Sequence, residues 1–150
     1  MLKQRLEQDL KQALLSGDKE RALVLRSLKS VILYAEVSKG ARDAGLPDDE
    51  IVALLTKEAK KRQESADLYV RGNSQDRADK ELAEKKIIEA YLPQQLSDDE
   101  LSAIIDEVVT ETGAQGMSAM GQVIGAVKQK AGASADGSRI AQMVKEKLAQ

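Results

Sequence analysis

The chain has 150 residues, 42% of them hydrophobic, with 23 Lys and Arg against 25 Asp and Glu. It contains no His and no Cys, which excludes disulfides, cysteine metal sites and nucleophilic catalysis of the Ser-His or Cys-His type. A formal net charge of −2 argues against a general polyanion binder, so a nucleic-acid function would depend on where the cations gather.

Helical periodicity without strand-like alternation predicts an all-α fold, with about four helices in an N-terminal hairpin subdomain and three in a small C-terminal domain. The first apolar stripe indicates a helix over about 2–15, and the next a helix over about 19–39. Gly17 suits the residue that follows the first helix, and Asp18 suits the N-cap of the second.

The second predicted helix carries a broad apolar face. One stripe is widened by further apolar residues on both sides. The stripe is formed by Leu25, Leu28, Ile32 and Ala35, and the residues that widen it are Leu23, Val24, Val31 and Tyr34. A face of this width predicts burial against more than one neighbour.

A loop at 40–50 contains Pro47, which with the following acids favours the start of a third helix that continues to about Arg71. A fourth helix then reaches about residue 92, and the two are expected to form an antiparallel hairpin with a solvated far end. The segment KEAKKRQE at 57–64 is interpreted as an exposed face with opposite charges four residues apart. The alternative is a polyanion or protein contact.

Pro93 marks the clearest domain boundary, because it blocks continuation of the fourth helix. Ser97 and Glu100 then form a capping box for the next helix. The predicted domains are an N-terminal helical subdomain over residues 1–93 and a three-helix domain over residues 94–150. The helices expected in the second domain span about residues 98–111, 117–131 and 135–149, the last opened by Ser134 as N-cap.

Charge is unevenly distributed within the second predicted domain. Residues 94–113 carry six acids and no base, whereas residues 114–150 carry five bases against two acids, a net charge of +3. Acids in a first helical turn stabilise the helix dipole, so the acidic cluster is interpreted as capping rather than as a metal site. No metal, cofactor or catalytic residue is expected.

Gly121 and Gly125 lie one turn apart inside a predicted helix, where each glycine costs about 1 kcal/mol relative to Ala. Missing side chains let another backbone approach. The pair therefore predicts either tight packing on a neighbouring helix or close approach of a nucleic-acid backbone.

The turn between the last two helices is a second candidate feature. Helix N-termini attract phosphate, and neighbouring cations could add charge-assisted contacts. Asp136 opposes this interpretation because it occupies the same positive end, and the alternative is a well-capped turn with solvated lysines. The candidate RNA-binding residues are Gly121, Gly125, Lys128, Lys130, Gly132, Gly137, Arg139 and Lys145.

The chain resembles the YqeY family over nearly all of its length. The most specific segments are DKERALVLRSLKS, EAYLPQQLSDDEL and the ending MGQVIGAVK…ADGSRIAQMVKEKL. This family comprises small bacterial proteins similar to the C-terminal tail of GatB, a subunit of the glutamine-dependent tRNA amidotransferase. In that enzyme the tail helps to hold the outer region of the tRNA while chemistry proceeds on other domains.

The resemblance implies a non-catalytic, tRNA-associated accessory module of translation, with tRNA and a tRNA-dependent amidotransferase or another translation protein as partners. One alternative is a protein-interaction module that docks on a translation-related enzyme through its helical hairpin. Another is a component of a carbon–nitrogen ligase with glutamine as amido-N-donor, a label that family records often carry. The chain has neither an amidase domain nor an ATP-using domain, so no turnover is expected from it alone.

The expected location is cytoplasmic, with no membrane association. The N-terminal segment MLKQRLEQDLKQ lacks the continuous apolar run of a signal peptide. No stretch of the sequence is long and apolar enough to span a membrane.

Overall fold

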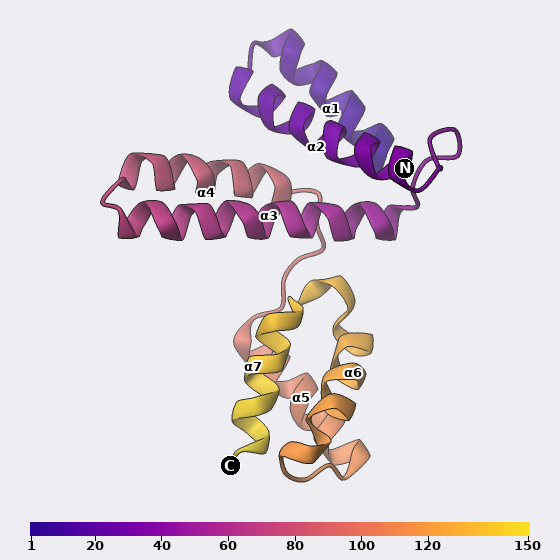
Figure 1. The fold of residues 1–150 in the computed structure, drawn as a ribbon, viewed down its shortest axis with the longest axis vertical. Coiled ribbons are helices and arrows are strands. Elements are labelled where there is room, and N and C mark those ends of the chain that lie inside the picture. Colours follow the sequence, from indigo (N-terminus) through magenta and orange to yellow (C-terminus); the bar gives the residue numbers. More distant parts are fainter. The chain divides into compact units, whose positions relative to one another are not determined.

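The computed structural model describes all residues 1–150 and contains helices and no strands, which confirms the all-α prediction. The chain divides into two units, Met1–Leu92 and Pro93–Gln150 (Figure 1). None of the helices combines the length and the apolar character that a membrane span requires.

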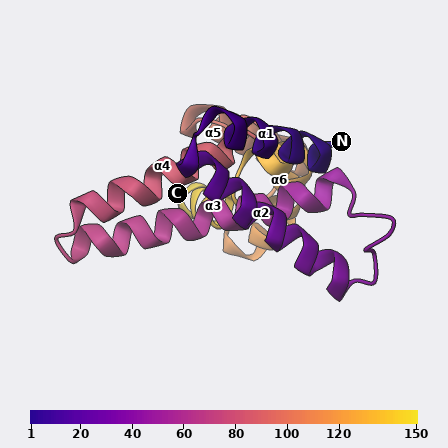
Figure 2. The same cartoon turned by 90° about the horizontal axis from the view of Figure 1, so that it is seen from above.

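Four helices form the first unit as two antiparallel hairpins. They are α1 (Leu2–Ser16), α2 (Lys19–Ser38), α3 (Asp48–Arg71) and α4 (Gln75–Glu89). In both views α3 and α4 lie side by side, and the loop between α2 and α3 extends beyond the ends of these helices (Figure 1 and Figure 2). Gly17 adopts φ 76° after α1, and the Asp18 side chain accepts a hydrogen bond from the Arg21 backbone N–H at 3.1 Å. Both capping predictions are therefore confirmed.

The core of the first unit is aliphatic and draws on all four helices. Its fully buried members include Leu25, Leu28, Ile32, Ile51, Leu55 and Ile88. The broad face of α2 is covered only in part, because Leu23 remains 60% exposed and Tyr34 77% exposed. The prediction that this face packs against more than one neighbour is confirmed, because α2 contacts α1, α3 and α4, but these helices cover one side of the face and leave the other open.

The charged segment of α3 packs against α4 instead of facing solvent throughout. Glu58 is 7% exposed, and its carboxylate lies 3.5 Å from Arg62 Nη1. Arg62 Nε in turn lies 3.1 Å from Glu84 Oε2 on α4. Small buried residues at the contact, Ala66 and Ala78, let the two helices approach. The interpretation of this segment as an exposed face was therefore wrong for Glu58 and Arg62.

Tyr91, just after the end of α4, packs against the hairpin formed by α1 and α2. The residue is 5% exposed, and its hydroxyl donates a hydrogen bond to Asp9 Oδ2 on α1 at 2.5 Å. The Arg5 guanidinium lies 4.8 Å from the ring centroid, and Arg21 pairs with the same Asp9 carboxylate at 3.7 Å. Burial, followed by the hydrogen bond to Asp9, raises the pKa of Tyr91 above its ordinary value.

We expect Tyr91→Phe to lower the free energy of unfolding by about 1 kcal/mol at neutral pH, because one buried hydrogen bond is lost. A raised pKa in the folded state contributes stability that is present below the unfolded pKa of about 10 and is lost as pH rises through the folded pKa. Urea unfolding between pH 7 and pH 11 should therefore show a loss at high pH that is smaller in the variant. Identical pH profiles for both proteins would contradict this role for Tyr91.

The second unit contains α5 (Asp98–Thr112), α6 (Met120–Ala131) and α7 (Gly137–Leu148), with short 3-10 turns η1 (Met117–Ala119) and η2 (Gly132–Ser134). The capping box is confirmed, because Ser97 Oγ accepts from the Glu100 backbone N–H at 3.1 Å and Glu100 Oε2 accepts from the Ser97 backbone N–H at 2.9 Å. The last helix begins later than predicted. Residues 132–134 form the 3-10 turn, so Asp136 and not Ser134 is the N-cap residue.

The second unit has a separate aliphatic core, to which each of its three α-helices contributes. The fully buried residues are Leu101, Val123, Val127, Ile140 and Val144, joined by Ile105, Val108 and Leu148. A core of this kind makes independent folding of the unit a physical expectation.

Residues 94–150 expressed alone are expected to fold into a helical unit with a cooperative thermal transition, because their core needs no side chain from the first unit. Circular dichroism checks this. Ile105→Asp in the same fragment is the control and should abolish the transition, since it buries an unpaired charge. If the unsubstituted fragment is itself unfolded, the predicted domain boundary is contradicted.

Candidate nucleic-acid interface

The helix α6 has two faces of different character. Val123, Val127 and Ala131 lie on the buried face and pack into the core of the unit. On the opposite face four of the candidate RNA-binding residues follow one another at spacings of four, three and four. They are Gly121, Gly125, Lys128 and Gly132, all of which are exposed. Three of the four sequence-predicted glycines and one of the predicted cations therefore form a single strip along α6 and its C-cap, while Gly137 lies at the start of α7.

The two helical glycines are open to solvent. A Cβ atom placed on Gly121 or Gly125 would meet no other atom within 4 Å. Packing of α6 on a neighbouring helix of this chain therefore does not account for the pair, and that alternative was wrong. The strip leaves helix backbone bare, at a cost in helix propensity of about 1 kcal/mol for each glycine.

Lys128 connects this strip to the start of α7. Its Cε atom lies 3.4 Å, and its Nζ atom 3.6 Å, from the position that a Cβ on Gly137 would occupy. Gly137 is the first residue of α7, so an ammonium group lies beside a helix N-terminus, where the helix dipole is positive. Lys128 forms no ion pair, and neither does Lys145, which is exposed in the last turn of α7.

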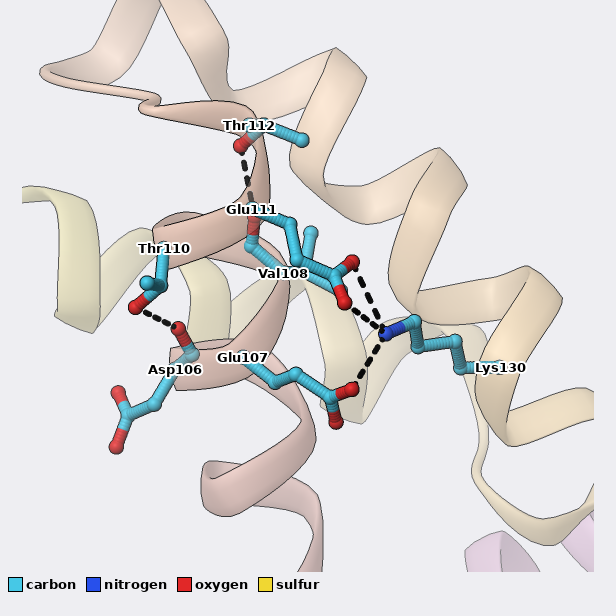
Figure 3. Close-up of polar contacts among 7 residues, drawn as sticks. All are labelled: Asp106, Glu107, Val108, Thr110, Glu111, Thr112 and Lys130. Atoms are coloured by element: carbon cyan, nitrogen blue, oxygen red, sulfur yellow. Dashed lines mark hydrogen bonds and ion pairs between the residues drawn. The ribbon is translucent and has the colours of Figure 1, made fainter.

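Lys130, by contrast, faces the acidic side of α5. Its Nζ donates to Glu107 Oε1 at 2.9 Å and to both carboxylate oxygens of Glu111 at 3.1 Å (Figure 3). The hydrogen bond from Lys130 lowers the pKa of Glu107. Hydrogen bonds to Glu107 and then Glu111 raise the pKa of Lys130. This cation is engaged within the unit, away from the glycine strip.

Arg139 is engaged in the same way at the other end of α5. Its Nη2 lies 2.6 Å from Asp98 Oδ1, and its Nη1 donates to the Leu96 carbonyl oxygen at 2.7 Å. About two turns further along α7, Lys147 forms an ion pair with Asp106. The acids are eight residues apart and so are the bases. This matched spacing, which joins two parallel helices, was the one sequence signal that could have revealed the pairing.

Three of the five cations in this unit are thus neutralised by acids of α5. Residues 93–150 carry five bases against eight acids, a net charge of −3. The α5 acids do more than stabilise a helix dipole, because Asp106, Glu107 and Glu111 lie beyond its first turn and hold the neighbouring helices. Lys128, on the glycine strip, and Lys145, in the last turn of α7, are the cations left without an ion pair in this unit.

The sequence matches the Yqey-like protein family over residues 3–148. The chain belongs to the YqeY family. It is also 32% identical over 87 residues to proteins named "Altered inheritance of mitochondria protein 41, mitochondrial" from Vanderwaltozyma polyspora and from Eremothecium gossypii. Each alignment covers 58% of this chain and 46% of the relative, so this YqeY protein matches less than half the length of these relatives.

The open glycine strip leads to a stability prediction. Gly125→Ala should raise the free energy of unfolding by up to about 1 kcal/mol, because Ala favours a helix and its methyl group meets no atom. Gly132→Ala is the control and should be destabilising, since Gly132 has φ 56°. Thermal unfolding followed by circular dichroism distinguishes them. A destabilising Gly125→Ala would show that another part of the protein packs on this strip.

Proposed function

We propose that this YqeY protein is a non-catalytic, tRNA-associated accessory module, similar in role to the C-terminal tail of GatB. The observation that carries the proposal is the open strip of Gly121, Gly125 and Lys128 beside the N-terminus of α7. Bare backbone, one free ammonium group and helix N–H groups suit a sugar-phosphate backbone, and RNA helices are recognised mainly by shape and backbone contacts. Membership of the family over residues 3–148 supports the same role.

The charge balance limits how tightly the module would bind by itself. Phosphate contacts supply most of the affinity in nucleic-acid binding, and the second unit offers only Lys128 and Lys145 as cations without an ion pair. We therefore propose that the module acts together with a tRNA-dependent amidotransferase or another translation protein that supplies further contacts. The cytoplasm stays our expected location. The mitochondrial location in the names of the two relatives describes those proteins, and either compartment contains tRNA.

The test is a salt titration of tRNA binding by the full chain. Replacing both free lysines with Ala should weaken binding and lower the slope of log K against log salt by about 1.5, since each lost phosphate contact lowers it by roughly 0.7 to 0.9. The variant is Lys128→Ala with Lys145→Ala. The matched control is Lys80→Ala with Lys86→Ala, two exposed lysines of α4 that also lack ion pairs.

Gly125→Leu tests the glycine strip in the same assay. The larger side chain enters open space, so the fold should survive while the RNA backbone loses its close approach. Equal tRNA affinity and equal slopes for wild type, the Lys128 and Lys145 double variant and Gly125→Leu would exclude this surface as the RNA contact.

A further inference from the structure

The helix α2 presents an unusual amount of apolar surface to solvent. Leu23 is 60% exposed, Leu33 45%, Tyr34 77% and Val37 56%. Leu23 and Tyr34 share a line with Ser27, Ser30 and Ser38, at spacings of four, three, four and four along the helix. This line faces away from the core that Leu25, Leu28 and Ile32 complete. This face therefore combines large apolar side chains with three serines and is left uncovered by the other helices of the first unit.

A groove runs between this face of α2 and the helix α3. Its main part has a volume of about 650 Å³ and is lined by Val31 and Tyr34 from α2 and by Leu54, Lys57 and Lys61 from α3. A second hollow of about 340 Å³ shares Ser30 with it and continues along α2 to Leu23. From Leu23 to Ser38 the groove follows fifteen residues of α2, or roughly 22 Å at 1.5 Å per residue. That length matches a partner helix of about four turns.

The charges around the groove are mostly positive. Arg26 and Lys57 line it and form no ion pair. The carboxylates that line it are Glu58, held by Lys61 and Arg62, and Glu84, held by Arg62. Free cations therefore flank an apolar floor whose acids are already engaged.

We propose that this groove binds an acidic amphipathic helix of a partner protein. The apolar stripe of that helix would lie on Val31, Tyr34 and Leu54, as in other helix-in-groove complexes, and its flanking carboxylates would pair with Arg26 and Lys57. Tyr34 is the only aromatic side chain in the lining, beside the aliphatic Leu23, Val31 and Leu54, and this composition favours a protein over an RNA, because RNA recognition uses aromatic stacking and phosphate contacts. The site lies in the first unit and goes beyond the tRNA interface proposed for the second.

A photo-crosslinking experiment identifies the occupant. A benzophenone amino acid replaces Tyr34 in the full chain, within the cells that make the protein, and the crosslinked peptide is sequenced. The same replacement at Leu15, an 80% exposed residue of α1 outside the groove, is the matched control. The expected product is a nuclease-resistant crosslink, specific to position 34, to a segment with carboxylates flanking an apolar helical stripe.

The captured segment is then synthesised as a peptide and titrated against the purified protein. Arg26→Glu with Lys57→Glu should weaken its binding by roughly tenfold or more, because like charges replace opposite ones. Lys11→Glu, an exposed and unpaired lysine of α1, should leave binding unchanged, and all variants should keep the wild-type melting curve. Crosslinks to RNA, to a second copy of this chain or to a basic segment would overturn the proposal, as would equal yields at positions 34 and 15. Salt-dependent tRNA binding is measured separately, so either proposal can fail without the other.

Discussion

Ion pairs along α5 join the three helices that pack around the aliphatic core of the second unit, and they determine which of its cations are free to meet a partner. Lys130 joins α6 to the far end of α5, while Arg139 and Lys147 join α7 to the same helix at two points eight residues apart. Each of these contacts is largely exposed and weak by itself, but together they set the register of three short helices whose aliphatic core is small. The same contacts remove three cations from any contact with RNA.

Because three cations of the second unit are paired with acids, the glycine strip of α6 is the stronger indication of a contact surface. If the unit bound phosphates by charge alone, its surplus of acids would work against it. Open backbone at Gly121 and Gly125 allows a partner to approach α6 more closely than side chains would permit, at a cost in helix stability that no internal contact offsets. A weak accessory contact that depends on shape fits these observations better than a tight electrostatic one.

The two units expose surfaces of different chemistry. The first has a net charge of +1, from eighteen bases and seventeen acids over residues 1–92, and presents the apolar face of α2 beside unpaired cations. The second has a net charge of −3 and presents bare helix backbone beside Lys128. The first surface suits a partner helix, whereas the second suits a sugar-phosphate backbone.

The sequence by itself determined the helices, the break at Pro93 and the caps at Asp18 and Ser97, because these depend on interactions between residues three or four positions apart. Membership of the YqeY family could also be predicted from its segments. Only the tertiary structure decided which charges are free, since Lys130 and Glu107 are 23 residues apart and Arg139 and Asp98 are 41 apart.

The same limit applies to the apolar and glycine patterns. Periodicity showed that α2 has a broad apolar face and that Gly121 and Gly125 share a side of α6. It could not show whether another helix covers either surface, because coverage depends on how helices distant in sequence cross. In the folded chain Leu23, Tyr34 and both glycines remain open. Local patterns thus predicted the elements, and long-range packing decided which of their surfaces are available to partners.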